Sequence, residues 1–384
     1  MKKIIVVGAG YAGLSFIKGL TENIFSKAEV TLINNNSYHY HAAQLHKIAS
    51  GEADKSVIYD IEKIIDKRVK FVVDDVTKIG KDYILAKNGK YEFDYLVLSL
   101  GYEKEMFGIE GMDDAFDLGN YEKSLAIKDE IYNKINELKN SKIDELNIVV
   151  CGGGLSGVEL AGSLATELKE KEGKNNFEFN RVNIIIIEAL PNILPMYDKD
   201  VVQKATQILE NLGVKIMTNS KIIKKDDDGI EIENFGSLKG DIVIWTAGVK
   251  GNSLIDNSCF KSYRGRVEVN EYLKPKSCIE EIFIIGDIAA FKDKKTGKFY
   301  NPTAQIACQM GTHLAKIINA ELGLAKVPKF SYKNKGSVCS IGKNYAVGNI
   351  FGKNIYGKFA VIMKEIIEKK WNFALEGFKG LLRG

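Results

Sequence analysis

The chain has 384 residues, a length that predicts two or three domains. Hydrophobic residues make up 45% and charged residues 27%, an ordinary globular composition that excludes general disorder and the collagen-like and disulfide-scaffold classes. The 54 basic and 50 acidic residues leave a net charge of +4, which is too balanced to indicate a nucleic-acid-binding protein. We therefore expect no nucleic-acid partner.

The cysteines are odd in number and form no CxxC pair, so they indicate neither a disulfide framework nor a zinc site, and we expect no metal. Reduced thiols fit a cytoplasmic protein best. The N-terminus begins like a signal peptide, but its apolar run enters a glycine turn without a cleavage site. No apolar stretch of about 18 residues occurs, so we expect no membrane-spanning helix. The five cysteines are Cys151, Cys259, Cys278, Cys308 and Cys339.

Two segments of the chain share one pattern, an apolar run followed by a G-x-G-x-x-G turn and a helical periodicity. The run Ile4–Val7 precedes the turn GAGYAG at residues 8–13, and Asn147–Val150 precedes a second turn at residues 152–157. A second β-branched strand follows each unit, at Val30–Asn34 and at Val182–Glu188. This repetition predicts two similar strand–turn–helix units.

Three further apolar runs end in a glycine turn, which extends the predicted sheets. They are Tyr95–Leu100, Ile242–Thr246 and Ile282–Ile285. Strands that alternate with helices in this way predict an α/β fold with two Rossmann-like dinucleotide-binding domains, each built on a parallel doubly wound sheet.

The glycine turns have a chemical as well as a structural use. The first glycine makes the tight turn, the second lets the backbone approach a pyrophosphate, and the third lets the helix pack on the strand. The helix N-terminus then offers unpaired N–H groups and the positive end of the helix dipole. One such turn can be purely structural, but two with matching strands favour nucleotide binding.

The residue that ends the second strand of each unit is the candidate ribose ligand. Asn34 stands 21 residues after Gly13, close to the interval of about 20 in the fingerprint, but it lacks the usual negative charge. Glu188 stands 31 residues after Gly157, beyond a charged, Asn-rich insertion. A carboxylate there repels a 2′-phosphate, so Glu188 favours NADH over NADPH. The alternative interpretation of Glu188 is a surface carboxylate at a strand end with no role in binding.

The two glycine turns together with Ile284-Ile285-Gly286-Asp287 resemble the flavoprotein family with two dinucleotide-binding domains. The resemblance implies that the first unit binds FAD, with Asp287 holding its ribityl or pyrophosphate region, and that the second unit binds NADH. The implied FAD-binding residues are Gly8, Ala9, Gly10, Tyr11, Ala12, Gly13, Asn34, Val76, Gly101, Gly286, Asp287, Ala304 and Gln305. The implied NADH-binding residues are Gly152, Gly154, Gly157, Glu188 and Gly248.

Other motifs resemble one branch of that family, the type II NADH:quinone oxidoreductases. They include Trp245–Asn252, the Tyr38-His39-Tyr40 loop, a glutamate at Glu159 after the second turn, and AQIACQ at residues 304–309. The resemblance covers essentially the whole chain and implies an FAD domain at 1–112 and 270–330, an NADH domain at 113–269 and a C-terminal membrane-anchoring region at 331–384. Asn34 and Ser99-Leu100-Gly101 depart from the wider family without removing a required group.

The resemblance implies the reaction and its residues. NADH gives a hydride to the flavin, and the reduced flavin passes two electrons to a quinone such as menaquinone or ubiquinone. Glu159 is expected to orient the nicotinamide carboxamide or to influence proton uptake, and its alternative is a helix N-terminal glutamate stabilised by the dipole. Gln305 and Gln309 share one helix face and can donate to quinone oxygens, while Ala304 and Ala307 leave room for a ring. The alternative for that face is an ordinary polar helix surface.

Two other functions stay open at this point. Sulfide:quinone oxidoreductases share the fold, but they use a redox cysteine pair and do not need the intact second turn with its Glu188. A flavin-binding, NADH-sensing protein without turnover is the non-enzyme alternative. We therefore expect the five cysteines to be mainly structural.

The tail from Asn354 to Gly384 carries apolar residues at helical spacing with Lys and Arg between them, and Trp371 near its middle. This pattern predicts an interfacial helix that places the protein peripherally on the cytoplasmic face of the cell membrane. The tail can instead pack on the body of the protein or on a partner in a homodimer. Its basic residues are Lys358, Lys364, Lys369, Lys370, Lys379 and Arg383.

Overall fold

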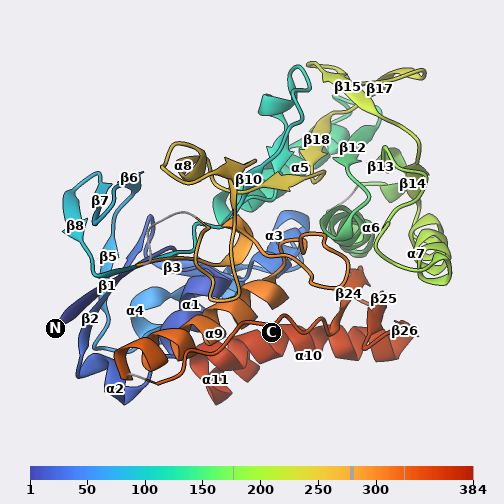
Figure 1. The fold of residues 1–384 in the computed structure, drawn as a ribbon. Helices are drawn as coiled ribbons and strands as arrows, with labels where there is room; N and C mark the ends of the chain where they lie inside the picture. The colour runs from blue at the N-terminus through green and yellow to red at the C-terminus, as the bar shows by residue number, and fades with distance from the viewer. Residues whose placement is uncertain (176, 277–280, 324, 384) are drawn as a thin grey trace. The chain divides into compact units, whose positions relative to one another are not determined.

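A computed structural model describes residues 1–175, 177–276, 281–323 and 325–383 (Figure 1). Cys278 lies outside the described residues. The chain forms two compact units, each drawn from three stretches of sequence. Unit 1 comprises Met1–Tyr40, Ile58–Glu103 and Val249–Asn334, and unit 2 comprises His41–Val57, Lys104–Gly248 and Lys335–Gly384.

Unit 1 is built on a five-stranded parallel sheet in the order β22-β9-β1-β2-β5. The central strand β1 is buried over its last four residues, which fits a parallel strand covered on both faces. The register pairs Val7 with Ile33 on one side and with Leu98 on the other. The strands are β1 Lys2–Val7, β2 Ala28–Asn34, β5 Lys70–Val73, β9 Tyr95–Leu98 and β22 Ile282–Ile284.

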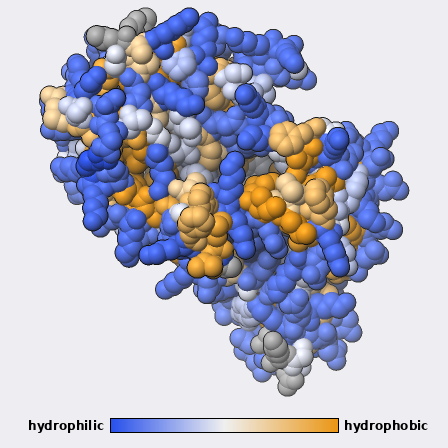
Figure 2. All heavy atoms as spheres, turned by 90° about the horizontal axis from the view of Figure 1, so that it is seen from below, coloured by the Kyte–Doolittle hydropathy of each residue, from blue (hydrophilic) through white to orange (hydrophobic). Residues whose placement is uncertain are grey.

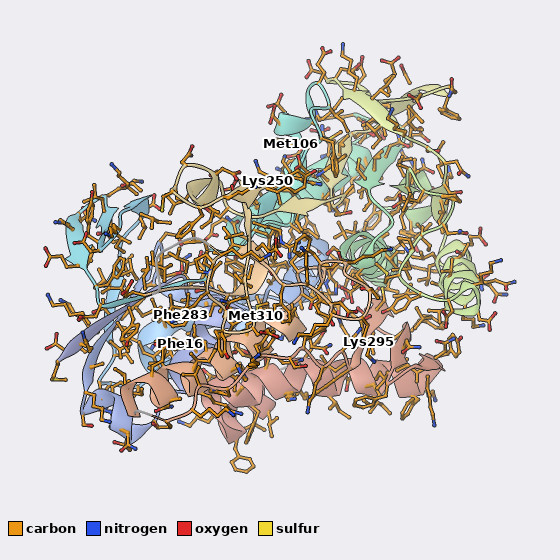
Figure 3. All side chains as sticks on the ribbon, in the orientation of Figure 1. Phe16, Met106, Lys250, Phe283, Lys295 and Met310 are labelled. Atoms are coloured by element: carbon orange, nitrogen blue, oxygen red, sulfur yellow. The ribbon has the colours of Figure 1, made fainter. Side chains whose placement is uncertain are left out.

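Two helices of unit 1 lie side by side, α1 at Tyr11–Lys18 and α9 at Ala304–Gly323. They approach closely because Gly311 faces α1, where a Cβ atom would lie 2.1 Å from the Ala12 carbonyl oxygen. Phe16 of α1, Phe283 of β22 and Met310 of α9 are fully buried (Figure 3). The helix pair therefore completes the core of the sheet.

Smaller elements complete unit 1. They are α2 Glu22–Phe25, β3 Tyr38–Tyr40, β4 Ile58–Asp60, α4 Ile61–Ile64, β6 Val76–Ile79, β7 Tyr83–Ala86, β8 Gly89–Glu92, α8 Ser253–Asp256, β20 Ser262–Tyr263, β21 Arg266–Glu268, η5 Gly286–Ile288 and β23 Ala289–Ala290. The two-residue strands β10 Glu103–Lys104 and β19 Val249–Lys250 stand where the chain passes between units.

Unit 2 repeats the architecture with a parallel sheet in the order β11-β18-β12-β13-β14. Its central strand β12 is buried throughout and pairs Cys151 with Ile187 and with Trp245. The strands are β11 Phe116–Asp117, β12 Leu146–Cys151, β13 Val182–Ile187, β14 Val214–Met217 and β18 Ile242–Trp245. The expected α/β fold with two Rossmann-like units is thus confirmed.

The helices of unit 2 pack an apolar core that is continuous with this sheet. The charged, Asn-rich insertion spans Leu168–Asn180, and its composition predicts a solvated helix end and loop. In the structure α6 continues to Asn175, and Leu168 is fully buried. The helical elements are η1 Ala42–Gln44, α3 Leu45–Ser50, η2 Lys55–Val57, η3 Met112–Asp114, α5 Tyr121–Lys139, α6 Leu155–Asn175, η4 Phe179–Arg181 and α7 Lys199–Asn211. A three-stranded meander adds β15 Ile222–Lys225, β16 Gly229–Ile232 and β17 Gly236–Lys239.

The C-terminal region belongs to unit 2 instead of standing as a separate segment. Its small antiparallel sheet packs on α6 through β24, and the long helix α10 packs on β25. Among the described residues, no helix is both long enough and apolar enough to cross a bilayer. The elements are β24 Gly336–Ile341, β25 Tyr345–Ile350, β26 Lys353–Tyr356, α10 Gly357–Glu376 and α11 Phe378–Leu381.

The unit boundaries differ from the domain boundaries expected from the sequence. The stretch 249–269 lies in unit 1 because β21 pairs with β23 there. The stretch 41–57 lies in unit 2 because α3 packs on α5 and α6. Both differences arise from pairing between segments that are distant in the sequence.

Candidate functional site

The first glycine turn joins β1 to α1 in unit 1. Gly8 has φ +99°, and a Cβ atom on it would lie 2.3 Å from the Ser99 carbonyl oxygen. A Cβ on Gly13 would lie 2.0 Å from the Gly8 carbonyl oxygen. A Cβ on Gly10, in contrast, meets no described atom within 4 Å. The first and third glycines are therefore required by the fold, while Gly10 borders the open space that a pyrophosphate needs.

The second glycine turn, between β12 and α6, has the same design in unit 2. Gly152 has φ +119°, and its Cβ would lie 2.8 Å from the Ala247 nitrogen. A Cβ on Gly157 would lie 1.9 Å from the Gly152 carbonyl oxygen, and none of the described atoms lies within 4 Å of a Cβ on Gly154. In both turns the first and third glycines have no room for a side chain, while the second borders the open space that a pyrophosphate needs. We call each of these turns a glycine cradle.

A hydroxyl group braces each turn, a feature that the sequence did not reveal. Ser99 Oγ donates to the Gly8 carbonyl oxygen at 2.9 Å, and Thr246 Oγ1 approaches the Gly152 carbonyl oxygen at 3.1 Å. Each hydroxyl follows the strand that neighbours the turn, β9 or β18. A Ser or Thr directly after β9 or β18, the strands that pair with β1 and β12, is the signal that could have found it.

The strand-end residues Asn34 and Glu188 contact the turns directly. Asn34 Oδ1 accepts the Ala9 N–H at 2.8 Å. Glu188 Oε2 accepts the Gly153 N–H at 2.7 Å, and its Oε1 accepts the Leu190 N–H at 2.8 Å. Each side chain therefore lies at the mouth of its turn, the position from which a ribose hydroxyl is bound.

The Gly286-Asp287 pair lies against the start of α1 and α9. Gly286 has φ +74°, and a Cβ on it would lie 3.1 Å from the Ala12 Cβ. The Arg266 guanidinium fixes the backbone by donating from Nε to the Asp287 carbonyl oxygen at 3.0 Å. Burial raises the pKa of the Asp287 carboxyl to about 6, although the Arg266 charge opposes this.

No hydrogen bond to the Asp287 carboxylate is made from within the described ranges. A half-buried carboxylate that has no donor among the described residues lies where a hydroxyl-bearing ligand can supply one. This carboxylate and the space beside Gly10 fit the ribityl and pyrophosphate groups of FAD.

Three further residues of the expected FAD set lie in unit 1. The Tyr11 ring makes an edge contact with His39, whose Nδ1 lies 2.9 Å from the Ala9 carbonyl oxygen. Val76 begins β6 and is half-buried, and Gly101 follows β9 with φ +72°. In unit 2, Gly248 has φ +98°, and a Cβ there would collide with the Phe107 ring.

The start of α9 carries the AQIACQ motif. Thr303 Oγ1 accepts the Ile306 N–H at 3.3 Å and so caps the helix. Ala304 and Gln305 are half-buried, and Ala307 is buried. The Gln309 amide pairs with the backbone of Lys333, donating to its carbonyl oxygen and accepting its N–H, each at 3.0 Å. Gln309 therefore already holds a segment of its own unit.

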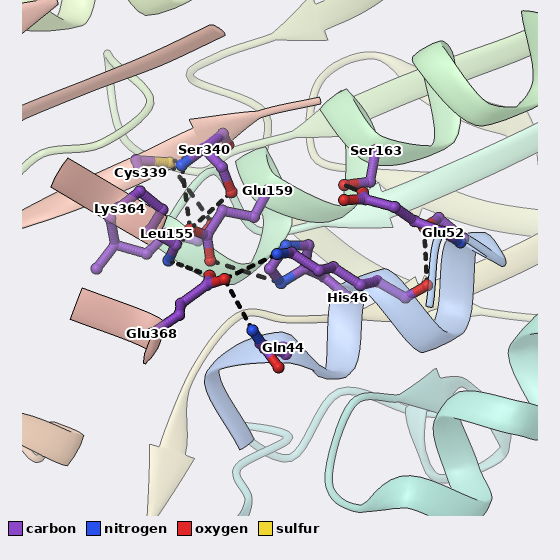
Figure 4. Close-up of polar contacts among 12 residues, drawn as sticks. Gln44, His46, Glu52, Leu155, Glu159, Ser163, Cys339, Ser340, Lys364 and Glu368 are labelled. Carbon is purple, nitrogen blue, oxygen red and sulfur yellow. Dashed lines mark hydrogen bonds and ion pairs between the residues drawn. The ribbon is translucent and has the colours of Figure 1, made fainter. Parts of the chain in front are cut away.

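Glu159 lies within a buried polar cluster of unit 2, which we call the Glu159 cluster (Figure 4). Its Oε1 accepts from Lys364 Nζ at 2.7 Å and from the Ser340 N–H at 3.1 Å, and His46 Nδ1 lies 3.7 Å from its Oε2. Burial alone raises its pKa, yet the Lys364 and His46 contacts outweigh burial and hold the pKa below its usual range. The cluster also contains Gln44, Lys47 and Glu368.

The position of Lys364 corrects the sequence-based interpretation of the tail. Lys364 was grouped with the basic residues expected to face lipid, but only 13% of its side chain is exposed, and it pairs with Glu159. The outward face of α10 and α11 carries apolar side chains instead (Figure 2). These are Phe359, Ile362, Ile366, Ile367, Phe373, Phe378 and Leu382.

The four described cysteines form no disulfide, and Cys151 and Cys339 are buried. Burial raises the pKa of the Cys151 thiol to about 12, which makes it a poor nucleophile.

Two glycine turns that leave space for a pyrophosphate, with a half-buried carboxylate near the first, are the features of a protein that binds two dinucleotides. A model of the pyridine nucleotide-disulphide oxidoreductase family matches residues 2–311. Type II NADH:quinone oxidoreductases of Staphylococcus saprophyticus and Staphylococcus aureus are each 37% identical to the chain over 98% of its length and 96% of theirs. The chain therefore belongs to the type II NADH:quinone oxidoreductase family, which confirms the resemblance found in the sequence.

Solved structures agree with the fold. NDH2 from Plasmodium falciparum, solved with NADH, superposes with a TM-score of 0.89 at 21% identity and covers 100% of this chain and 98% of that one. The sulfide:quinone oxidoreductase of Aquifex aeolicus gives a TM-score of 0.79 at 18% identity, covering 98% and 92%. Both similarities are below 25% identity and concern the fold alone.

Proposed function

We propose that this chain oxidises NADH with a resident FAD and reduces a quinone without pumping protons. The observation that carries the proposal is the pair of glycine cradles, in which Gly10 and Gly154 border open space and the Asp287 carboxylate lacks a donor within the described residues. When bound, FAD supplies the hydride-accepting and two-electron-donating chemistry. The protein itself then has to bind the two dinucleotides, orient them and exclude water from the site.

The first cradle would hold FAD. Its glycines and Tyr11 would lie along the pyrophosphate and the start of the flavin, and Asn34 would meet the ribose. Val76 and Gly101 would border the cofactor, and Asp287 would accept its hydroxyl hydrogens. Ala304 and Gln305 would approach the flavin from the start of α9.

The second cradle would hold NADH. Gly154 borders the space that the pyrophosphate would occupy, Gly152 and Gly157 let the turn and α6 pack closely, and Gly248 follows the neighbouring strand β18. Glu188 keeps its carboxylate at the mouth of the turn, where it would accept from a ribose 2′-hydroxyl and repel a 2′-phosphate. Glu159 would act on the nicotinamide side, within reach of the Lys364 ammonium.

The quinone, a menaquinone or a ubiquinone, would lie at the start of α9. Ala304 would leave room for the flat ring, with the buried Ala307 packed beneath it on the same helix, and Gln305 would supply the hydrogen bond donor. Gln309 is a weaker candidate than the sequence suggested, because its amide would first have to leave Lys333.

The outward face of α10 and α11 would attach the enzyme peripherally to the cytoplasmic face of the membrane. Seven large apolar side chains are exposed there, more than an isolated surface residue would explain. Exposed basic residues would meet anionic lipid, each contributing about 1 kcal/mol near the surface. They are Lys358, Lys369, Lys370 and Lys379.

The test is stopped-flow absorbance with the FAD-loaded protein. NADH should bleach the flavin within milliseconds to seconds, and a menaquinone or ubiquinone analogue should restore the colour in a second phase. Bleaching without quinone-dependent recovery would make this chain a flavin-binding sensor or a reductase of another acceptor. Sulfide in place of NADH should leave the flavin oxidised.

A further inference from the structure

Glu368 is the second carboxylate of the Glu159 cluster, one helical turn after Lys364 on α10. Only 6% of its side chain is exposed. Its Oε2 accepts from Gln44 Nε2 and from Lys47 Nζ, each at 2.8 Å. Its Oε1 lies 3.7 Å from Lys364 Nζ. One carboxylate therefore connects α10 with η1 and α3 (Figure 4).

The Lys364 ammonium lies between two carboxylates on different elements. It donates to Glu159 Oε1 of α6 at 2.7 Å, and Glu368 on its own helix is the farther partner. Since Lys47 pairs with Glu368, the two lysines balance the two carboxylates inside the unit. A buried charge is stable only when it has partners of opposite charge, so the loss of one charge shifts the pKa values of the groups that remain.

We propose that Glu368 is a positioning residue for the redox reaction. Its carboxylate keeps the Lys364 ammonium protonated and directed at Glu159, and it anchors the turn at residues 44–47 to α10. The inference rests on the proposed function, because it assigns Glu159 a place in that reaction. Glu368 acts through Lys364 and is not itself a catalytic residue.

The other groups that face the pair do not supply the same charge. His41 and His46 are neutral because burial lowers the pKa of each to about 4. Burial, followed by the Glu159 charge, raises the pKa of the Cys339 thiol. Tyr197, whose hydroxyl bonds to Ser337, has its pKa raised by burial. Only the lysines and carboxylates therefore carry charge near neutral pH.

The expected effect of neutralising Glu368 follows from this balance. Burial by itself lowers the pKa of Lys364, but Glu159 and Glu368 outweigh burial and hold the pKa above its usual value. Without the Glu368 charge, burial is opposed by Glu159 alone. Lys364 then loses its proton at a lower pH, and its ammonium no longer balances Glu159.

The test uses the full chain loaded with FAD and the variant Glu368→Gln. Quinone turnover is measured from pH 6 to 11, together with flavin bleaching by NADH. We expect kcat of the variant to fall along an alkaline limb near the pKa of an ordinary lysine, about 10.4, whereas the unaltered protein, whose Lys364 holds its proton more tightly, should show no such limb below pH 11. KM for NADH should change less than about twofold.

Glu376→Gln is the matched control. Glu376 lies on the same helix and pairs with Arg383 at 2.7 Å, so this variant removes an equal charge from α10 outside the Glu159 cluster. Its pH profile should match that of the unaltered protein. A shift of equal size in Glu376→Gln would overturn the proposal, because net charge on the helix would then be the cause.

A structural measurement keeps the proposal testable when turnover is weak. Hydrogen exchange of the amides at residues 44–50 should accelerate at least about tenfold in Glu368→Gln, because two anchoring contacts weaken. Glu368→Asp keeps the charge and should keep the pH profile even if exchange accelerates. The proposal fails if Glu368→Asp and Glu368→Gln shift the pH profile equally. It also fails if Glu368→Gln changes neither the pH profile nor the rate of hydrogen exchange.

Failure of the proposed function has a different signature. Absence of NADH bleaching in the unaltered protein removes the redox reaction but leaves the exchange result at residues 44–50 to judge the anchoring role. Normal bleaching and quinone turnover with an unshifted Glu368→Gln profile rejects the positioning role alone.

Discussion

Asn34 and Glu188 hold the same position in the two units and differ by one charge. Asn34 is the last residue of β2 and Glu188 directly follows β13. Each accepts an N–H group of its glycine turn, that of Ala9 at 2.8 Å and that of Gly153 at 2.7 Å. The amide suits a site that need not reject a phosphate, whereas the carboxylate creates a negative potential at the mouth of the second turn. Cofactor selectivity should therefore depend on Glu188.

Replacing Glu188 with Gln should relax the preference for NADH. The amide oxygen can still accept the Gly153 N–H, while the Leu190 N–H loses its acceptor, and the repulsion of a 2′-phosphate is removed. We expect the ratio of kcat/KM for NADH to that for NADPH to fall about tenfold, equivalent to about 1.4 kcal/mol. Steady-state kinetics with both nucleotides measure the ratio, and Asn34→Asp is the matched control, which should leave it unchanged.

The three glycines of the second turn should respond differently to alanine. Gly154→Ala places a methyl group into open space, so the protein should fold normally while KM for NADH rises, because the pyrophosphate loses its close approach. Gly157→Ala collides with a backbone carbonyl oxygen 1.9 Å away and should lower the melting temperature or prevent folding. Circular dichroism and NADH titration separate the two effects. Equal stability of both variants would contradict the geometry.

Substitutions of the two glutamines of α9 should also have different effects. Gln305→Leu is expected to raise KM for quinone several-fold while the rate of flavin bleaching by NADH stays unchanged, because the hydrogen bond donor offered to the quinone is lost. Gln309→Leu should raise quinone KM as well, but it also frees the Lys333 backbone and should loosen the segment before β24. Unchanged quinone kinetics in Gln305→Leu would reject its assignment.

Membrane attachment is best tested with point variants on the outward face of α10. Truncation before Asn354 should release the enzyme, but it also removes Lys364 and Glu368 and leaves Glu159 without its ammonium partner. Ile362→Asn together with Ile366→Asn should weaken binding to anionic vesicles about tenfold or more while turnover with a soluble quinone persists. Phe235→Ser, at an exposed turn in the meander, is the control in a vesicle sedimentation assay.

The buried His46 should make stability depend on pH below about 6.5. Its pKa is lowered to about 4 in the folded chain, mainly by burial, so the unfolded chain binds a proton that the folded chain does not. Stability is therefore unaffected above about pH 6.5 and falls by about 2–3 kcal/mol as the pH drops to about 4.5.

Urea unfolding at pH 7 and at pH 4.5 measures this loss. His46→Gln should lose less stability between the two pH values than the unaltered protein. Asp287, whose pKa is raised to about 6 by burial, acts in the opposite direction, but it is present in both proteins and cancels in the comparison. An identical loss in both proteins would show that His46 does not carry the effect.

Local patterns in the sequence were sufficient to predict the two parallel-sheet units and the family. Strand periodicity and the glycine spacing act within a few residues, and they fix a turn before any distant contact forms. The central strands were accordingly predicted to within two residues at each end, as β1 and β12 show. The positions of Asn34 and Glu188 follow from the same local geometry, because each strand has to end beside its turn.

The partners of the polar side chains were decided by tertiary structure alone. Lys364 is separated from Glu159 by 205 residues, and its place in an amphipathic tail suggested a lipid-facing cation. It is buried because the β24–β26 sheet carries α10 back onto the second unit. Likewise, the spacing of Gln305 and Gln309 predicted one shared face but not that the Lys333 backbone occupies the second amide. Helical spacing sets which residues share a face, whereas burial and charge pairing depend on what packs against that face.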